Sequence, residues 1–179
     1  MEEQELVRSI KAGNSEAFEA LYRLHADRAL RAAAAIVGDR MTAADAVQET
    51  FVRVYRHIGK YDASRPFRSW FYTILANECH RSMKKQLKTI PVDFEETKQE
   101  PAELDAYPFE EEDALYRLVR ELEEPFRLPI VLKYANDLTD QEIADAMDLN
   151  VNTVKSRLHK AKKKLKAWLL REKGEIGIG

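Results

Sequence analysis

Positively charged side chains are concentrated between Asn150 and Trp168. This stretch contains seven Lys or Arg residues and no Asp or Glu. Lys and Arg donate hydrogen bonds to phosphates and guanine edges, while Ser and Thr hydroxyls can contact several bases. Such a composition suits a surface that binds nucleic acid. The candidate contact residues are Thr153, Lys155, Ser156, Arg157, Lys160 and Lys164.

A second group of residues combines aromatic rings with positive charge between positions 66 and 88. Aromatic side chains crowd one side of a predicted helix, namely Phe67, Trp70 and Phe71. Polar and basic residues recur at spacings of four, three and four along another side, namely Asn77, Arg81, Lys84 and Lys88. Unpaired bases stack on rings while cations follow the phosphates. Aromatics at helical spacing are more often core residues, so we expect Phe71 and Trp70 to be at least partly buried.

A third group is a polar strip on the helix predicted after Thr42. Its apolar stripe is Val47, Phe51, Val54 and Ile58. Its other faces carry Asp45, Gln48, Glu49, Arg53 and Arg56. The acidic residues lie near the start of the helix, where the helix dipole favours them. An ordinary solvated face and a docking surface are both compatible with this strip.

The elements that position the basic stretch form a predicted helix-turn-helix. Thr139 and Glu142 have the spacing of a capping box, so a helix begins there. Asp148 and Asn150 tolerate turn conformations, and Asn150 can cap the next helix. The apolar stripe of that helix is Val151, Val154, Leu158, Ala161, Leu165 and Trp168. A basic helix without this context could be a solvated, membrane-surface or calmodulin-type helix, but the capped helix and turn favour a helix-turn-helix.

Other helices are predicted on both sides of a loop from residue 59 to residue 68. The chain should begin with a short helix ending near Gly13, followed by one that Ser15 caps and Gly38 ends. Thr42 and Asp45 suggest a third cap. Helical patterning resumes near residue 114, with Pro129 in an unfavourable position inside a helix. We expect an all-α protein.

The net charge and the single cysteine limit which kind of protein this can be. The 179 residues carry a net charge of −2, because residues 91–113 hold ten acidic residues against one Lys. That acidic segment predicts an extended linker between two helical domains. Cys79 is the single cysteine, which rules out an internal disulfide. We expect no metal site at His25, no membrane insertion, no cofactor and a cytoplasmic location.

Three motifs resemble the extracytoplasmic-function (ECF, group 4) sigma factors of bacterial RNA polymerase. The first is Asp45-x-x-Gln48-Glu49-x-Phe51-x-x-x-Tyr55. The second is Phe67-Arg68-Ser69-Trp70-Phe71-Tyr72 with Ala76-Asn77. The third is Leu138-Thr139-x-x-Glu142-Ile143-Ala144 followed by residues 153–161, TVKSRLHKA. The motifs occur in the family's order and span nearly the whole chain. Asp148 departs from the pattern, since the family usually has Gly in that turn, and this puts the orientation of the second helix in question.

The resemblance implies a division of labour along the chain. Residues 1–90 correspond to a sigma-2 domain, 91–112 to a flexible acidic linker, 113–173 to a sigma-4 domain and 174–179 to a tail. Asp45, Gln48, Glu49 and Arg53 would dock on core RNA polymerase at the clamp helices of its largest subunit, and the polymerase flap is a further expected partner. Unpaired minus-10 bases would meet Tyr61, Phe67, Arg68, Trp70, Asn77, His80, Arg81 and Lys84. The basic helix would bind the minus-35 duplex.

The resemblance also implies partners, and the sequence leaves one rival function open. Promoter DNA and core RNA polymerase are the expected partners, and an anti-sigma factor is common in the family. No catalytic residue is expected, because the sequence has no Gly-rich phosphate loop and no nucleophile triad. The alternative is a stand-alone helix-turn-helix regulator that binds operator DNA, which leaves the basic and aromatic stretch of residues 66–88 without a role.

Overall fold

The computed structural model describes residues 3–89 and 114–176, and every regular element in these two ranges is helical. The first range contains α1 (Glu3–Lys11), α2 (Ser15–Val37), α3 (Arg40–His57), the short 3-10 turn η1 (Ile58–Lys60) and α4 (Phe67–Thr89). The second contains α5 (Ala114–Glu121), α6 (Glu124–Ile130), the π-helical turn η2 (Val131–Ala135), α7 (Asp140–Met147) and α8 (Val151–Ile176). The prediction of an all-α fold is confirmed. The predicted acidic linker lies outside the described residues.

Polar side chains cap the starts of α2 and α3, and a glycine ends α2. Asn14 Oδ1 accepts hydrogen bonds from the backbone N–H groups of Glu16 and Ala17, so Asn14, not Ser15, is the cap of α2. Gly38 ends α2 at φ +80°, a left-handed conformation that glycine adopts without steric cost. Asp39 then caps α3 through Thr42, three residues before the predicted cap. Both caps were misplaced because the sequence offered two polar candidates at each site.

The core of the first half is built from aromatic rings on α3 and α4. Phe71 is fully buried, with its ring 5.2 Å from Phe51 and 5.3 Å from the imidazole of His25. His25 Nε2 also lies 3.2 Å from a Glu3 carboxylate oxygen, which ties α1 to α2. The predicted stripe on α3 is confirmed, since Val47, Phe51, Val54 and Ile58 are all buried. This packing fixes α3 and α4 side by side.

The helix-turn-helix of the second half forms as predicted. Thr139 Oγ1 accepts from the Glu142 N–H, and the Glu142 carboxylate accepts from the Thr139 N–H at 2.7 Å. Asp148 ends α7 at φ 52° and ψ 50°, so the turn is made without the family's usual glycine. Asn150 Oδ1 accepts from the Asn152 N–H at 2.8 Å and caps α8. Asp tolerates the left-handed region better than most residues, so it can end α7 in this conformation.

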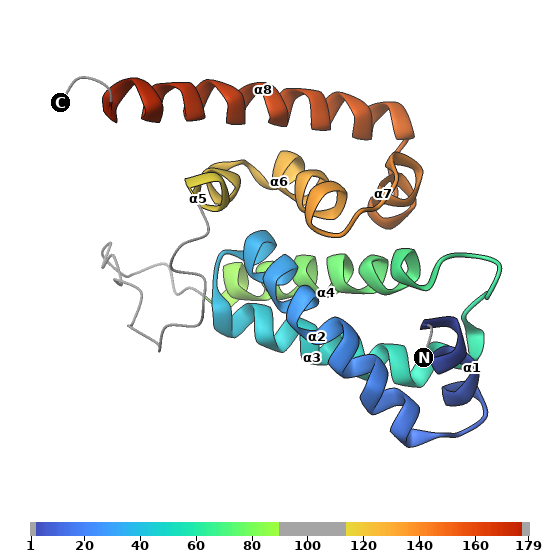
Figure 1. Ribbon diagram of the computed structural model, residues 1–179. Helices are drawn as coiled ribbons and strands as arrows, with labels where there is room; N and C mark the ends of the chain where they lie inside the picture. The colour runs from blue at the N-terminus through green and yellow to red at the C-terminus, as the bar shows by residue number, and fades with distance from the viewer. Residues whose placement is uncertain (1–2, 90–113, 177–179) are drawn as a thin grey trace.

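The two halves pack against each other in layers. Figure 1 shows α8 outermost, α5, α6 and α7 beneath it, and the helices of the first half below. In the contact layer, α7 lies on α4 and η2 lies on α2. Arg68 Nη2 donates to the Asn136 carbonyl at 2.8 Å, and Arg28 and Arg68 lie 3.5 and 3.6 Å from the Asp137 carboxylate. The described residues of the two halves therefore share one continuous hydrophobic core.

Candidate nucleic-acid interface

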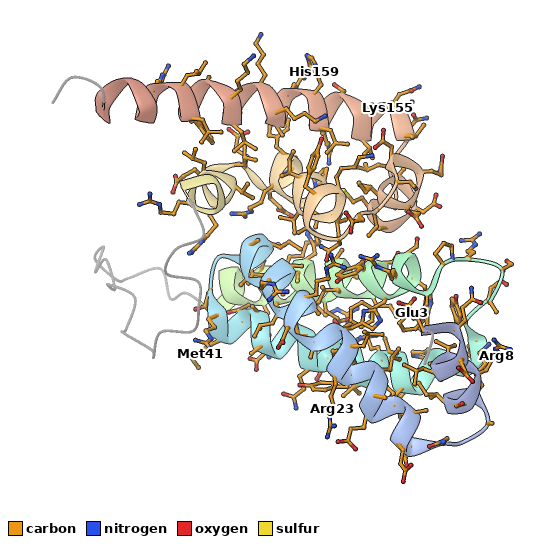
Figure 2. All side chains as sticks on the ribbon, in the orientation of Figure 1. Glu3, Arg8, Arg23, Met41, Lys155 and His159 are labelled. Atoms are coloured by element: carbon orange, nitrogen blue, oxygen red, sulfur yellow. The ribbon has the colours of Figure 1, made fainter. Side chains whose placement is uncertain are left out.

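The outer face of α8 carries most of the predicted DNA contacts. Its apolar stripe faces inward, with Val154, Leu158, Ala161 and Leu165 buried. Lys155, Ser156 and Lys160 are exposed, and Thr153 and Arg157 are partly exposed. Lys155 and His159, which are labelled on α8 in Figure 2, are both exposed. The outer face of α8 is therefore uncovered in the packed arrangement of the two halves.

Lys164 differs from the other predicted contacts on α8. Its Nζ lies 3.2 Å from a Glu123 carboxylate oxygen and 4.8 Å from the centre of the Phe126 ring. Both partners stand next to or within α6, on which α8 packs. The ammonium therefore joins α8 to the helix beneath it. These contacts favour a packing role for Lys164, and its expected contact with DNA stays a prediction.

Two exposed residues of α8 were missed by the sequence analysis. Asn152 and His159 lie four residues before and three residues after Ser156, so the three share one helical face. An Asn side chain can form two hydrogen bonds with adenine in the major groove. His159 also lines a shallow hollow whose other walls include Lys133, Lys155 and Lys162. A pattern of positive charge does not reveal either side chain, because Asn152 is uncharged and His159 is only weakly basic.

The residues predicted to contact minus-10 bases differ in how deeply they are buried. Tyr61 and Phe67 are 6% and 2% exposed, with ring centres 5.6 Å apart. The Tyr61 hydroxyl donates to the Arg65 carbonyl. Trp70 is half-buried and packs 5.1 Å from Tyr61. Tyr61 and Phe67 therefore anchor the two ends of an exposed loop, residues 62–66, and their rings are not open for stacking in this arrangement.

Two more of these residues contact the second half of the chain. Arg68 is bound to the Asn136 carbonyl, as described above, and His80 Nδ1 lies 2.7 Å from the Glu124 carboxylate. Asn77, Arg81 and Lys84 remain exposed. They line a hollow between α3 and α4. The stripe predicted along α4 is thus present as a surface for its first three members, while the side chain of Lys88 lies outside the described residues.

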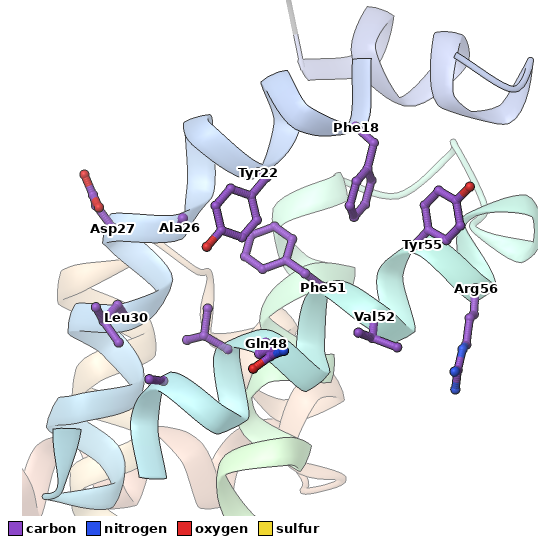
Figure 3. Close-up of a pocket in the computed structure, with 12 residues that line it drawn as sticks. Phe18, Tyr22, Ala26, Asp27, Leu30, Gln48, Phe51, Val52, Tyr55 and Arg56 are labelled. Atoms are coloured by element: carbon purple, nitrogen blue, oxygen red, sulfur yellow. The ribbon is translucent and has the colours of Figure 1, made fainter. Parts of the chain in front are cut away.

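The polar strip on α3 is exposed at Asp45, Gln48 and Glu49. Beside it, α2 and α3 enclose a groove lined by Phe18, Tyr22, Leu30, Gln48, Val52 and Tyr55, among others. Figure 3 shows the Phe18, Tyr22 and Tyr55 rings around this groove, with Gln48 at its edge. Exposed apolar surface rimmed by polar residues is typical of a protein-binding site. The strip therefore adjoins an apolar groove that the sequence pattern did not reveal.

Arg53 departs from the predicted strip. Its Nε lies 2.5 Å from a carboxylate oxygen of Glu78 on α4. Its side chain lines the hollow that also contains Trp70 and Asn77. The structure thus places Arg53 on the side of α3 that faces α4.

Other chemistry has few candidates in the described residues. No group of three or more His, Cys, Asp or Glu side chains in the described part of the chain could hold a metal ion. Cys79 is fully buried, and burial raises the pKa of its thiol to about 12. No helix among the described residues is both long enough and apolar enough to cross a bilayer.

Two known protein families match the chain, one in each half. Residues 21–89 match the family described as Sigma-70 region 2. Residues 112–165 match the family described as Sigma-70, region 4. The two matches occur in this order along the chain.

Similar sequences cover most of the chain. The RNA polymerase sigma factor SigV of Bacillus subtilis is 30% identical over 142 residues, covering 79% of this chain and 84% of SigV. The ECF RNA polymerase sigma factor SigW of the same organism is 27% identical over 176 residues, covering 91% of this chain and 94% of SigW.

Solved structures share the fold. The sigma factor RpoE of Bartonella quintana, in complex with the anti-sigma factor NepR, gives a TM-score of 0.67 at 21% identity, covering 85% of this chain and 96% of RpoE. CnrH, in complex with the cytosolic domain of CnrY, gives 0.66 at 23% identity, covering 93% of this chain and 96% of CnrH.

Proposed function

The chain belongs to the ECF RNA polymerase sigma factors, which recognise promoters as non-catalytic subunits of the polymerase, and on that premise we propose how its surfaces divide the work. Residues 1–90 bind core polymerase and the minus-10 element, and residues 113–173 bind the minus-35 element. The observation that supports this division most directly is the pair of exposed polar surfaces on α4 and α8.

The duplex-binding surface is the outer face of α8. Thr153, Lys155, Ser156, Arg157 and Lys160 stand on this helix, which is capped and held by α7 as in other helix-turn-helix units. Asn152 and His159 extend the same surface. Its position outside the packed core supports insertion into a major groove without prior unfolding. For Lys164 we infer a role in the packing of α8 on α6, from its contacts with Glu123 and Phe126.

The single-strand surface is the exposed part of α4 with the preceding loop. Asn77, Arg81 and Lys84 are available at once, whereas Arg68 and His80 become available when the second half moves away. Trp70 offers part of its ring beside them. Rings and cations on one surface suit unpaired bases, and the melted minus-10 strand is their proposed ligand.

Core polymerase docks on α3 through Asp45, Gln48 and Glu49. The proposed contact is the clamp helices of the largest subunit, with the adjacent apolar groove taking part. The polymerase flap is proposed to bind the second half. The chain has no catalytic activity of its own in this proposal, requires no cofactor and works in the cytoplasm.

An anti-sigma factor is the proposed regulator. The structurally similar RpoE was solved with the anti-sigma factor NepR bound, which supports this proposal. The net charge of −2 also supports weak binding of promoter DNA by the free chain, because its acidic residues oppose approach to phosphates. Tight sequence-specific binding by the isolated chain at physiological salt would refute that part of the proposal.

A transcription assay tests the proposed function. Purified chain and core polymerase are combined on a promoter found by sequencing transcripts after overexpression. Specific initiation that depends on both components is expected. Failure to initiate by a properly folded chain would overturn the proposal.

The rival function, an operator-binding regulator, predicts no stable complex with polymerase. Gel filtration of the chain with core enzyme separates the two. Co-elution supports the sigma-factor role, and separate elution together with tight binding of duplex DNA supports the rival.

A further inference from the structure

A single buried carboxylate lies among the cations of the hollow between α3 and α4. Glu78 is 4% exposed, in a wall that also includes Arg53, Arg81 and Lys84. A carboxylate removed from water loses several kcal/mol of solvation unless it is paired. A neutral residue would fill this position at lower cost. Glu78 therefore needs positively charged partners at this buried position, and its role follows from which residues these are.

Two arginines pair with Glu78 from different directions. Arg53 Nε, on α3, lies 2.5 Å from Oε1, while Arg81 Nη1, one turn along α4, lies 3.2 Å from the same oxygen. Arg81 also reaches Oε2 at 3.4 Å. One carboxylate thus bridges guanidinium groups from two helices.

The pairing leaves most of each guanidinium free for another ligand. A guanidinium has five N–H donors, and Glu78 contacts one nitrogen of each arginine. The Arg53 and Arg81 side chains are 37% and 60% exposed, and both line the hollow that contains Asn77 and Trp70. The carboxylate holds the two cations beside each other, where they would otherwise repel. Their remaining donors are accessible from the hollow.

We propose that Glu78 is a positioning residue for binding of the unpaired promoter strand, and that Arg53 and Arg81, held by it, contact the backbone phosphates of that strand. This inference rests on the proposed function of α4 and moves Arg53 from the polymerase-docking strip to the DNA-binding surface. A planar guanidinium held in a fixed direction suits a phosphate because it can donate two parallel hydrogen bonds.

A positioning role and simple charge repulsion predict opposite effects of Glu78→Gln on DNA binding. If Glu78 acted only through its charge, Glu78→Gln would remove repulsion and strengthen binding to DNA. If Glu78 positions the arginines, Glu78→Gln weakens binding although the protein becomes more positive. Glu78→Asp keeps the charge but shortens the reach by one methylene, and it should weaken binding as well.

The experiment measures binding of holoenzyme, made from the full chain and core polymerase, to a short fluorescein-labelled non-template strand from the minus-10 region of a mapped promoter. We expect Glu78→Gln and Glu78→Asp to weaken binding roughly tenfold, the scale of one charge-assisted hydrogen bond. An arginine that no longer binds its phosphate should also flatten the salt slope by about 0.7 units. A merely structural role would leave that slope unchanged.

Further variants test whether Glu78 acts through the two arginines. In an Arg53→Ala, Arg81→Ala background, Glu78→Gln should have no additional effect. Glu19→Gln is the matched control, because Glu19 forms an exposed ion pair with Arg23 on α2, and it should change nothing. Melting temperatures are measured for every variant, and only variants that remain folded at the assay temperature are compared.

The outcomes distinguish the inference from the function on which it rests. Stronger or unchanged binding by Glu78→Gln would overturn the positioning role, as would a loss that persists without both arginines. Failure of the unsubstituted holoenzyme to bind the strand at all would instead overturn the proposed function of α4.

Discussion

At the scale of single residues, Cys79 shows how burial decides chemistry. The thiol is fully enclosed by the core, and this burial, with a smaller contribution from the Glu78 carboxylate, raises its pKa to about 12. The thiolate is the reactive form of cysteine, so a thiol that stays neutral at physiological pH and inaccessible is inert. The single cysteine of this chain is therefore a core residue and a poor sensor of oxidants.

Labelling with a thiol reagent tests this conclusion. The native protein should react orders of magnitude more slowly than the same protein in denaturant, since the reagent must wait for opening of α4. Rapid labelling of folded protein at neutral pH would contradict the buried position of Cys79.

Asp39 makes a second prediction at this scale. Hydrogen bonds from the Thr42 side chain and backbone lower the pKa of the Asp39 carboxyl below its usual value of 3.8. Asp39→Ala should destabilise the fold by about 1 kcal/mol, a typical cost of losing an N-cap. Asp39→Asn should retain most of the cap, and denaturant unfolding measures both.

The pH dependence of the Asp39 cap follows from the direction of its pKa shift. The folded state favours the carboxylate, so the ionic part of the stabilisation is present above pH 3.8 and is lost as the pH falls through the lowered pKa. The stability difference between the wild type and Asp39→Asn should therefore shrink in acid. A difference that grows below pH 3.8 would contradict the capping geometry.

At the scale of elements, α8 separates residues that contact bases from those that pack. Arg157→Ala should cost about 1–3 kcal/mol of minus-35 binding and relax preference at one base pair if Arg157 contacts a base. Lys163→Ala, at an exposed position, should weaken binding to all sequences and flatten the salt slope by about one unit. Binding titrations of holoenzyme to matched and mismatched duplexes measure both effects. Identical behaviour of the two variants would contradict the assignment of Arg157 as a residue that contacts a base.

Lys164 should behave differently from both. Its contacts with Glu123 and Phe126 suggest that Lys164→Ala lowers the stability of the second half by about 0.5–1 kcal/mol, the scale of an exposed ion pair or cation–π contact. Thermal unfolding detects that loss, while the salt slope of minus-35 binding should stay the same.

Sequence patterns predicted the elements better than the contacts between them. The apolar stripes of α3 and α8 and the Thr139–Glu142 capping box are local, because spacing of three or four residues fixes which side of a helix is buried. The Arg53–Glu78 pair and the groove between α2 and α3 join separate helices. No spacing along one helix encodes them. The same limit explains why Tyr61 and Phe67 turned out to be core residues.

At the scale of the whole molecule, the two halves cover part of the proposed single-strand surface. Acidic side chains of the second half face basic residues of the first, as in the contacts of Asp137 with Arg28 and Glu124 with His80. These pairs are largely exposed, and exposed ion pairs contribute only about 0–1 kcal/mol each. These ion pairs therefore add little to the free energy that holds the two halves together, and stronger partners can compete for the same charged residues.

A double variant tests whether these pairs hold the halves together. Asp137→Asn combined with Glu124→Gln should increase the separation between fluorophores attached at Met41→Cys and Lys163→Cys, one in each half. Glu19→Gln in the same labelled protein is the control. No change in energy transfer would mean that apolar packing of α7 on α4 keeps the halves closed without help from charge.

The central claim is that α4 binds unpaired strand and α8 binds duplex, and one crossed binding measurement tests it most directly. Holoenzymes carrying Asn77→Ala or Arg157→Ala are titrated with a single-stranded minus-10 oligonucleotide and, separately, with a minus-35 duplex. We predict that Asn77→Ala weakens binding of the single strand alone and Arg157→Ala weakens binding of the duplex alone. Equal losses on both ligands for both variants, or losses in the reverse pattern, would contradict the account.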